Sequence, residues 1–414
     1  MNSRGNLLFY VVATLTLLAA TMDHPAISVG GATLRVSWFC VIPLAVFIWS
    51  ELKGERNVLI FCIVFLGASL PSLMHSVALG KSFFYLAWVL FDYFIFFSIF
   101  YTASTRLAGD IFHPIFWISR FHIIVGLLLF ILRIQDRPAS FLYEPSNLSI
   151  VLIPYVVALL FRTRFARWYD YALLLLFVVT SQSATLLLFF GAVLVLSWAQ
   201  RSFQRRGLIR AVIRFSALVV IGVSAFLAYV YNVDDLNTTV IRKLIDNVSG
   251  DSLFALLMRG GNRYPRMVAA LNVGLDNWLF GTGLGAYDEF AARNTISSPE
   301  FFEPLLLAEG QPAVNIWLEV FATVGVLGLV CFVAFSIYVF LVAVRSDNRI
   351  RWILSSIMIS MFLVMSFESN FVRAYLWCYL GLVLGLARRF SAKSSTGSGP
   401  CLVSPALRSR TVGN

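Results

Sequence analysis

The chain has 414 residues, of which 59% are hydrophobic and 13% are charged, and its mean hydropathy is +0.82. A water-soluble protein needs far more charge to cover its surface, so this composition excludes a soluble domain. The net charge of +11 would suit a nucleic-acid binder, but the basic residues lie in loops between apolar runs, so no nucleic-acid partner is predicted.

Apolar runs recur along the chain, and most of them are close to the roughly twenty residues that a helix needs to cross a bilayer. Backbone polar groups in lipid are satisfied only within helices or closed barrels, and the lack of apolar–polar alternation excludes a barrel. The predicted spans are residues 6–22, 34–50, 57–74, 82–103, 112–133, 147–161, 168–181, 184–199, 211–230, 313–344, 351–367 and 371–388. The predicted fold class is an all-α polytopic membrane protein with about twelve transmembrane helices and one large extracytoplasmic loop that contains short helices.

The basic residues of the short loops predict the sidedness of the chain. They gather in every second loop, in the groups Arg162/Arg164/Arg167, Arg201/Arg205/Arg206/Arg210, Arg345/Arg349/Arg351 and Arg388/Arg389/Lys393. Because cytoplasmic loops carry the excess of arginine and lysine, both termini are predicted to be cytoplasmic. The predicted domains are helices one to nine in residues 1–230, the extracytoplasmic loop 231–312, helices ten to twelve in 313–390, and a disordered cytoplasmic tail, 391–414.

The long loop contains a segment, residues 262–266, that is typical of a helix start. Asparagine is a common cap and proline is tolerated in a first helical turn, so a helix is predicted over residues 265–276. The glycine-rich residues 280–285 that follow favour a sharp turn over a nucleotide-binding loop, because no strand precedes them. Residues 240–245 and 253–257 are predicted to form short amphipathic helices at the membrane surface.

Arg259, Arg263 and Arg266 form a basic cluster at this predicted helix start. Free N–H groups and the helix dipole favour an anion there, and guanidinium groups bind phosphate in a bidentate manner. The cluster predicts a diphosphate clamp that faces the outer leaflet, in which Arg263 also stabilises the charge of the leaving group. The alternative is a solvated basic face that touches lipid headgroups.

Charged residues inside predicted spans are costly in lipid and are therefore candidates for function. Arg120 and His122 lie in the fifth predicted span and Asp92 lies in the fourth, so Arg120 is a candidate diphosphate ligand. The alternative is a structural ion pair in which these residues hold one another. Arg35 and Arg373 lie near the outer ends of their spans, where a long side chain is expected to snorkel to the interface.

Two carboxylates at the predicted outer face are candidates for a catalytic base. Glu144 precedes the sixth predicted span, and Glu309 lies where the long loop re-enters the membrane. Either carboxylate can accept a proton from an attacking hydroxyl, whereas the structural alternative for Glu144 is to cap a helix. The four histidines and five cysteines show no catalytic or metal-ligand spacing, so neither a metal nor another cofactor is predicted.

The layout resembles the O-antigen ligase and polymerase superfamily of bacterial surface-polysaccharide assembly. The resemblance covers about residues 140–345 and rests on Arg263-Tyr264-Pro265-Arg266, Asp276-Asn277-Trp278-Leu279-Phe280-Gly281-Thr282-Gly283-Leu284-Gly285, Asn315-Ile316-Trp317-Leu318-Glu319 and Val324-Gly325-Val326-Leu327-Gly328. Glu144-Pro145-Ser146 and the turn at residues 180–183 look like those of polymerase-type members. The histidine that ligases carry before the asparagine is Val314 here, and the ligases' Ser-Arg turn is Ser183-Ala184, which favours a polymerase.

The resemblance implies a metal-independent membrane glycosyltransferase of the bacterial inner membrane, a polymerase of exopolysaccharide or O-antigen type. Such an enzyme transfers glycan from undecaprenyl diphosphate to the hydroxyl of another lipid-linked repeat unit at the periplasmic face, surrounded by membrane lipid. A flippase and a chain-length regulator of the same pathway are the implied protein partners. The alternatives are a ligase that moves glycan to a lipid or protein acceptor, a twelve-span glycan transporter, and a channel or structural subunit. Repeated halves with broken helices, typical of many transporters, are not visible in the sequence.

Overall fold

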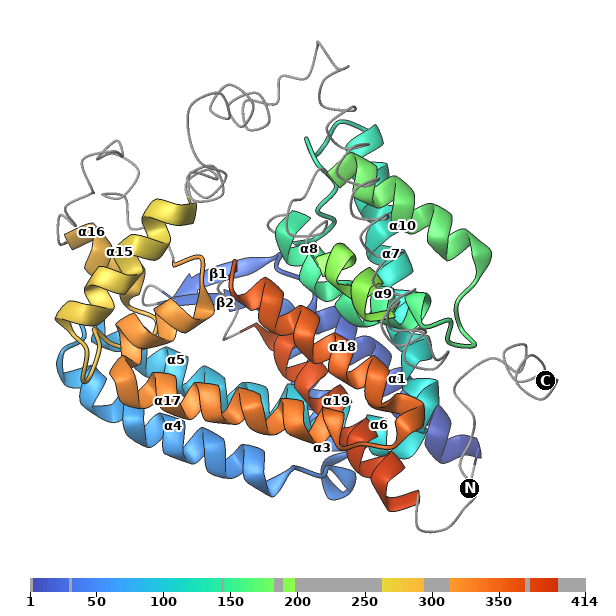
Figure 1. The fold of residues 1–414 in the computed structure, drawn as a ribbon, viewed down its shortest axis with the longest axis horizontal. Coiled ribbons are helices and arrows are strands. Elements are labelled where there is room, and N and C mark those ends of the chain that lie inside the picture. Colours follow the sequence, from blue (N-terminus) through green and yellow to red (C-terminus); the bar gives the residue numbers. More distant parts are fainter. Residues whose placement is uncertain are drawn as a thin grey trace, which may run out of the picture.

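The computed structural model describes residues 3–29, 32–142, 145–181, 189–197, 263–293, 313–368 and 373–393. These residues are mostly helical, which confirms the predicted helical class, and Figure 1 shows the helices packed along one another. Three helical segments are long and apolar enough to cross a membrane: Arg56–Met74, Leu79–Ile131 and Ile316–Val344. The count of twelve spans and the layout of the long loop stay predictions.

Most of the described helices lie within predicted spans, whereas the predicted span 211–230 and parts of the predicted span 184–199 lie outside the described residues. The first group is α1 (Ser3–Ala20), α2 (Val36–Phe39), α3 (Val41–Phe47), η1 (Trp49–Glu51), α4 (Arg56–Met74), α5 (Leu79–Phe91), the π-helix η2 (Asp92–Phe97), α6 (Ser98–Leu107), η3 (Ala108–Ile111) and α7 (Phe112–Ile131). The second group is α8 (Pro145–Val151), α9 (Ile153–Leu160), α10 (Trp168–Ser181), α15 (Arg263–Asp276), α16 (Tyr287–Arg293), α17 (Ile316–Val344), α18 (Asn348–Met365) and α19 (Ala374–Lys393). The predicted amphipathic helices at 240–245 and 253–257 lie outside the described residues.

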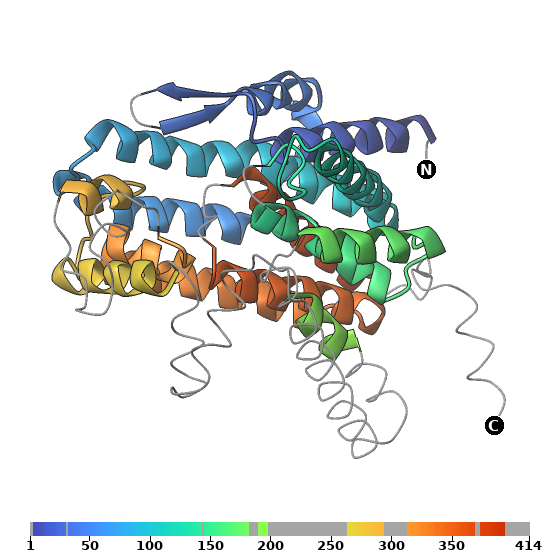
Figure 2. The same ribbon diagram turned by 90° about the horizontal axis from the view of Figure 1, so that it is seen from above.

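The chain also contains a short two-stranded sheet, so an all-helical description is incomplete. β1 (Ala26–Val29) and β2 (Ala32–Arg35) pair antiparallel, with Ala26 opposite Arg35 and Ile27 opposite Leu34. Four-residue strands are too short to stand out against the apolar runs on either side. The hairpin lies along α5 (Figure 2), and it holds Arg35 at the last position of its second strand.

Small residues set how closely the central helices pack. At Gly381 of α19 an added Cβ would lie 2.6 Å from the Phe97 carbonyl oxygen, and at Gly385 it would lie 2.7 Å from that of Tyr101. Only glycine therefore allows α19 to approach the backbone of η2 and α6 this closely. Close approach through small residues is how membrane helices gain packing energy where lipid removes most of the hydrophobic driving force.

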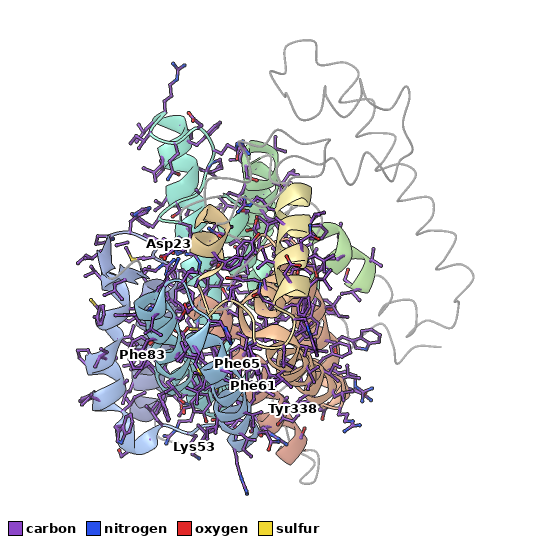
Figure 3. The ribbon with its side chains drawn as sticks, turned by 90° about the vertical axis from the view of Figure 1, so that its left-hand side faces the viewer. Asp23, Lys53, Phe61, Phe65, Phe83 and Tyr338 are labelled. Atoms are coloured by element: carbon purple, nitrogen blue, oxygen red, sulfur yellow. The ribbon has the colours of Figure 1, made fainter. Side chains whose placement is uncertain are left out.

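Polar clusters mark two different ends of the bundle. α15 and α16 lie at one end, whereas α1 begins and α19 stops at the other (Figures 1 and 2). Near that second end the Glu55 carboxylate accepts hydrogen bonds from the hydroxyls of Tyr101 and Tyr338, each at 3.0 Å, and from Arg388 Nη2 at 2.6 Å. Tyr338 is labelled in Figure 3, as is Lys53, which precedes Glu55 by two positions in the sequence. This cluster ties α4, α6, α17 and α19 together, so we assign it a structural role.

Candidate functional site

Helix α15 provides the predicted anion-binding helix start. The helix runs over Arg263–Asp276, which confirms the helix predicted for residues 265–276 and begins it two residues earlier. Arg263 and Arg266 thus lie in its first turn, where the free N–H groups point outward. Arg266 is partly exposed and lies within electrostatic range of Tyr287 on α16, whose hydroxyl pKa is raised by burial.

The face of α15 that turns away from solvent packs on α17 and α16. A small buried cluster joins the three helices through Ala270, Val273, Tyr287, Ala291, Ala313 and Ala322. At Gly274 an added Cβ would lie 2.4 Å from the ring of Phe321, so a side chain there would displace this ring from its place between α15 and α17. The second half of α15 is therefore positioned by the start of α17.

The glycine-rich segment after α15 is a turn, as predicted, and it is anchored in a break of α17. Gly281, Gly283 and Gly285 have φ values of 72°, 104° and 73°, which L-residues with a side chain rarely adopt. The backbone N–H of Thr282 donates to the Ala322 carbonyl at 2.9 Å, and that of Gly283 donates to the Thr323 carbonyl at 3.0 Å. These carbonyls are available because α17 is interrupted at Gly325, with φ 74° and ψ −168°.

Asn315 caps the start of α17. Its Oδ1 accepts hydrogen bonds from the backbone N–H of Trp317 at 2.9 Å and of Leu318 at 3.1 Å, while its Nδ2 donates to the Ser366 carbonyl at 2.8 Å. The Trp317 indole N–H donates to the Ser366 hydroxyl at 3.1 Å. The asparagine of the family motif therefore fixes the first turn of α17 against the end of α18. Val314, which stands where ligases carry histidine, is buried and offers no titratable group.

A buried lysine joins α5 to α16. Lys81 Nζ donates to Asp288 Oδ1 at 2.6 Å and to Oδ2 at 2.7 Å, and Glu289 Oε1 lies 3.7 Å away. Only 6% of Lys81 is exposed, whereas the Asp288 side chain is 34% exposed. The pair holds α16 over the start of α5. Sequence inspection did not single it out, because the partners are 207 positions apart.

Glu319 is a carboxylate that sequence inspection did not select as a base. It lies in the first turn of α17, and its Oε2 is buried with no hydrogen-bond partner among the described residues. Tyr85, Tyr287 and Asp288 all lie within electrostatic range of it. A buried polar oxygen without a partner calls for an explanation, and a substrate hydroxyl would provide one. The signal in the sequence that could have identified Glu319 was its position four residues after Asn315 of the family motif.

Arg35 and Arg373 are brought together by Asp23 at the end of α1. Arg35 Nε and Arg373 Nη1 each donate to Asp23 Oδ1 at 2.5 Å. Both guanidinium groups are therefore held by one buried carboxylate, and the expectation that they snorkel to the membrane interface stays a prediction.

Arg120 lies elsewhere in the fold. Its Nε and Nη2 donate to the two oxygens of Asp170 at 2.7 Å and 2.9 Å, so the pair joins α7 to α10. α7 and α15 lie on opposite sides in Figures 1 and 2, and the structure does not bring Arg120 to the first turn of α15. The role of Arg120 as a diphosphate ligand stays a prediction.

The alternative that Arg120, His122 and Asp92 hold one another is wrong. The ring of His122 lies between the hydroxyls of Thr21, at 2.8 Å, and Ser140, at 3.0 Å. Asp92 is fully buried, and neither of its carboxylate oxygens has a partner within the part of the chain that the structure describes. Whether charged residues on different helices meet depends on how the helices pack, which the sequence did not specify.

Several predicted site residues are not placed by the structure. Arg259, Glu144 and Glu309 lie outside the described residues, and of Arg263 only the backbone is described. Their roles stay predictions. Across the described ranges, no three His, Cys, Asp or Glu side chains gather in a way that could hold a metal ion.

The fold and its apolar helical segments define a polytopic helical membrane protein with a polar site where α5, α15, α16 and α17 meet. Residues 171–333 match the family model described as O-antigen ligase, a range that contains α15, the glycine turn and the first part of α17. This match confirms the resemblance to the O-antigen ligase and polymerase superfamily. It indicates glycan transfer of the ligase or polymerase type by a membrane glycosyltransferase in polysaccharide biosynthesis. No curated protein matches the chain.

Proposed function

We propose that the protein is a polymerase of lipid-linked oligosaccharide repeat units. The observation that carries the proposal is the docking of α15 on the broken start of α17, with Arg263 and Arg266 both in the first turn of α15. A helix N-terminus with two arginines suits an anionic group, and a diphosphate is the anion of a polyprenyl-linked sugar donor. Both arginines lie inside the residues that match the O-antigen ligase family model.

In the proposed reaction the hydroxyl oxygen of one lipid-linked unit attacks the anomeric carbon of the glycan on undecaprenyl diphosphate. The bond between that carbon and the diphosphate oxygen breaks, and the electron pair leaves with the diphosphate. Arg263 and Arg266, with Arg259, would stabilise the negative charge that develops there. The proton of the attacking hydroxyl passes to a carboxylate. Glu144 and Glu309 are the bases proposed from sequence, and the unpartnered buried oxygen of Glu319 supports it as a third candidate.

The proposed setting is the periplasmic face of a bacterial inner membrane, with both termini in the cytoplasm and membrane lipid around the helices. No cofactor enters the proposed reaction, because the diphosphate leaving group supplies the driving force. A flippase that delivers the repeat units and a chain-length regulator are the proposed partners. The distribution of arginine and lysine over the loops supports this orientation.

Replacing Arg263 with alanine tests the proposal. We expect the polymer to be lost while the protein stays in the membrane at its normal level, because the donor diphosphate is no longer held. Arg164→Ala is the matched control, since Arg164 pairs with the exposed Asp110 far from α15 and its loss should leave the polymer intact. Polymer of normal length in the Arg263 variant would refute the clamp.

A ligase is the second candidate, and the description of the matching family favours it. The two enzymes act on the same donor, but a ligase transfers finished polymer to a different acceptor. Deletion strains separate them, because loss of a ligase leaves polymer on the carrier lipid and loss of a polymerase leaves single units. The buried Val314 at the position of the ligase histidine supports the polymerase.

A further inference from the structure

Two arginines in this protein share a single carboxylate oxygen. Arg35 Nε and Arg373 Nη1 both lie 2.5 Å from Asp23 Oδ1, so these two nitrogens are at most 5.0 Å apart, the sum of the two distances. Asp23 is the one carboxylate that forms an ion pair with either arginine among the described residues. Two positive charges thus share one ion-paired carboxylate in a small volume, and the carboxylate of Asp92 also lies within electrostatic range of Arg35.

The three side chains are largely removed from solvent. The Asp23, Arg35 and Arg373 side chains are 7%, 12% and 20% exposed. Like charges brought together with little water repel strongly, and one carboxylate balances only one of them. A structural ion pair needs one arginine. The second guanidinium therefore carries a positive charge that a bound anion would balance.

The surroundings of this cluster connect it to the site at α15 and α17. Tyr85 of α5 lies within electrostatic range of both arginines and also of Glu319 and Asp288. An added Cβ at Gly285 would lie 2.4 Å from the Tyr85 ring, so the glycine turn closes directly over that tyrosine. Tyr85 is thus near both the arginine cluster and Glu319 at the start of α17.

The cluster also lies where separate segments of the chain end. The Asp23 backbone N–H donates to the Phe141 carbonyl at 3.2 Å, just before the segment that carries Glu144. Arg35 is the last residue of β2, and Arg373 directly precedes α19. Asp23 is labelled in Figure 3, away from the Glu55 cluster marked by Lys53 and Tyr338. Arg35 and Arg373 are therefore both at the ends of secondary-structure elements.

We propose that Arg35 and Arg373 form a second oxyanion site, which binds the diphosphate of the lipid-linked acceptor. Guanidinium groups bind phosphate oxygens in bidentate fashion, and each of these groups has one described hydrogen bond, to Asp23, out of five N–H donors. Naming the acceptor rests on the proposed polymerase function, because a polymerase handles two polyprenyl diphosphates at once. The site at α15 holds the diphosphate that leaves, and the arginine pair holds the diphosphate that stays.

The test measures how many prenyl diphosphates the full-length protein binds in nanodiscs of zwitterionic lipid. Farnesyl diphosphate is the probe, and inorganic pyrophosphate shows whether the diphosphate alone suffices. We expect two binding sites in the wild-type protein and one in Arg35→Gln and in Arg373→Gln. Each of these variants keeps a one-to-one pair with Asp23, so each should remain folded, with a melting temperature close to that of the wild type.

Three comparisons decide the outcome. Arg164→Gln, which removes an arginine from an exposed pair at another place, should keep both sites. Arg263→Ala should remove the other site, so the proposed clamp at α15 can fail without affecting the arginine pair. Two sites retained in Arg35→Gln and Arg373→Gln would overturn the proposal. So would an effect of these variants that appears only in nanodiscs of anionic phospholipid, because the site would then bind ordinary headgroups.

Discussion

The break in α17 allows a sharp test of how the site is built. Gly325 has φ 74° and ψ −168°, a combination that is essentially restricted to glycine. An added Cβ there would lie 2.2 Å from the Leu279 carbonyl oxygen and 2.8 Å from the Phe280 backbone nitrogen. Gly325→Ala therefore places a methyl group where the backbone of the glycine turn now lies.

The cost of this substitution has two parts. A residue with a side chain held in such a conformation costs about 1–3 kcal/mol. The methyl group also pushes the turn away from α17, which threatens three backbone hydrogen bonds: Thr282 N–H to Ala322, Gly283 N–H to Thr323, and Val326 N–H to Trp278, at 2.9, 3.0 and 2.7 Å. At a net value of about 1 kcal/mol each, their loss brings the total to roughly 4–6 kcal/mol.

Hydrogen–deuterium exchange of the purified protein measures this local cost directly. We expect protection of the peptides that cover residues 277–286 to fall by several orders of magnitude in Gly325→Ala, since about 1.4 kcal/mol corresponds to a factor of ten. Gly67→Ala in α4 is the matched control, because no atom lies within 4 Å of an added Cβ there and alanine favours a helix. Unchanged exchange in the Gly325 variant would refute the view that the turn is held by the break.

Two further predictions concern carboxylates. Glu319→Gln should lower the rate of glycan transfer by about 10²-fold or more at an unchanged protein level, since a general base contributes about 10²–10⁴-fold. The rate is measured on lipid-linked units. A rate within threefold of the wild type would exclude Glu319 as the base. At the opposite end, burial tends to raise the pKa of Glu55, but its hydrogen bonds with Arg388 and two tyrosines bring the pKa below the usual 4.5. A lowered folded-state pKa stabilises the protein above pH 4.5 and loses that effect as the pH falls through the folded value. The melting-temperature difference between wild type and Glu55→Gln should therefore shrink below pH 4.5, and a constant difference down to pH 3.5 would contradict the assignment.

The helices were the most predictable part of the fold. The predicted spans at 57–74, 168–181 and 313–344 differ from α4, α10 and α17 by at most three residues at either end, because long apolar runs dominate the local signal. The β1–β2 hairpin was missed because its strands are only four residues long. The break at Gly325 was missed because an apolar run continues through it without interruption.

In the candidate site, too, features set by neighbouring residues could be predicted from the sequence, whereas contacts between distant residues could not. The start of α15 and the glycine turn were predictable, since caps and glycine runs act on their immediate neighbours. The pairing of Asp23 with Arg373 spans 350 positions, and that of Lys81 with Asp288 spans 207. No pattern in a single sequence reports such pairs, because they depend on which helix ends meet after the bundle has packed.

The arrangement of α17 explains why the proposed clamp can sit in a loop and still be precise. The turn after α15 bonds to the carbonyls of Ala322 and Thr323, which belong to the first part of α17 and are freed by the break at Gly325. Asn315 fixes the other end of that part of α17 to Ser366. The C-terminal end of α15 and the turn that follows it are thus held by backbone hydrogen bonds to an apolar helix. Substitutions that alter the polar residues around α15 should therefore change substrate binding while leaving the position of the helix unchanged.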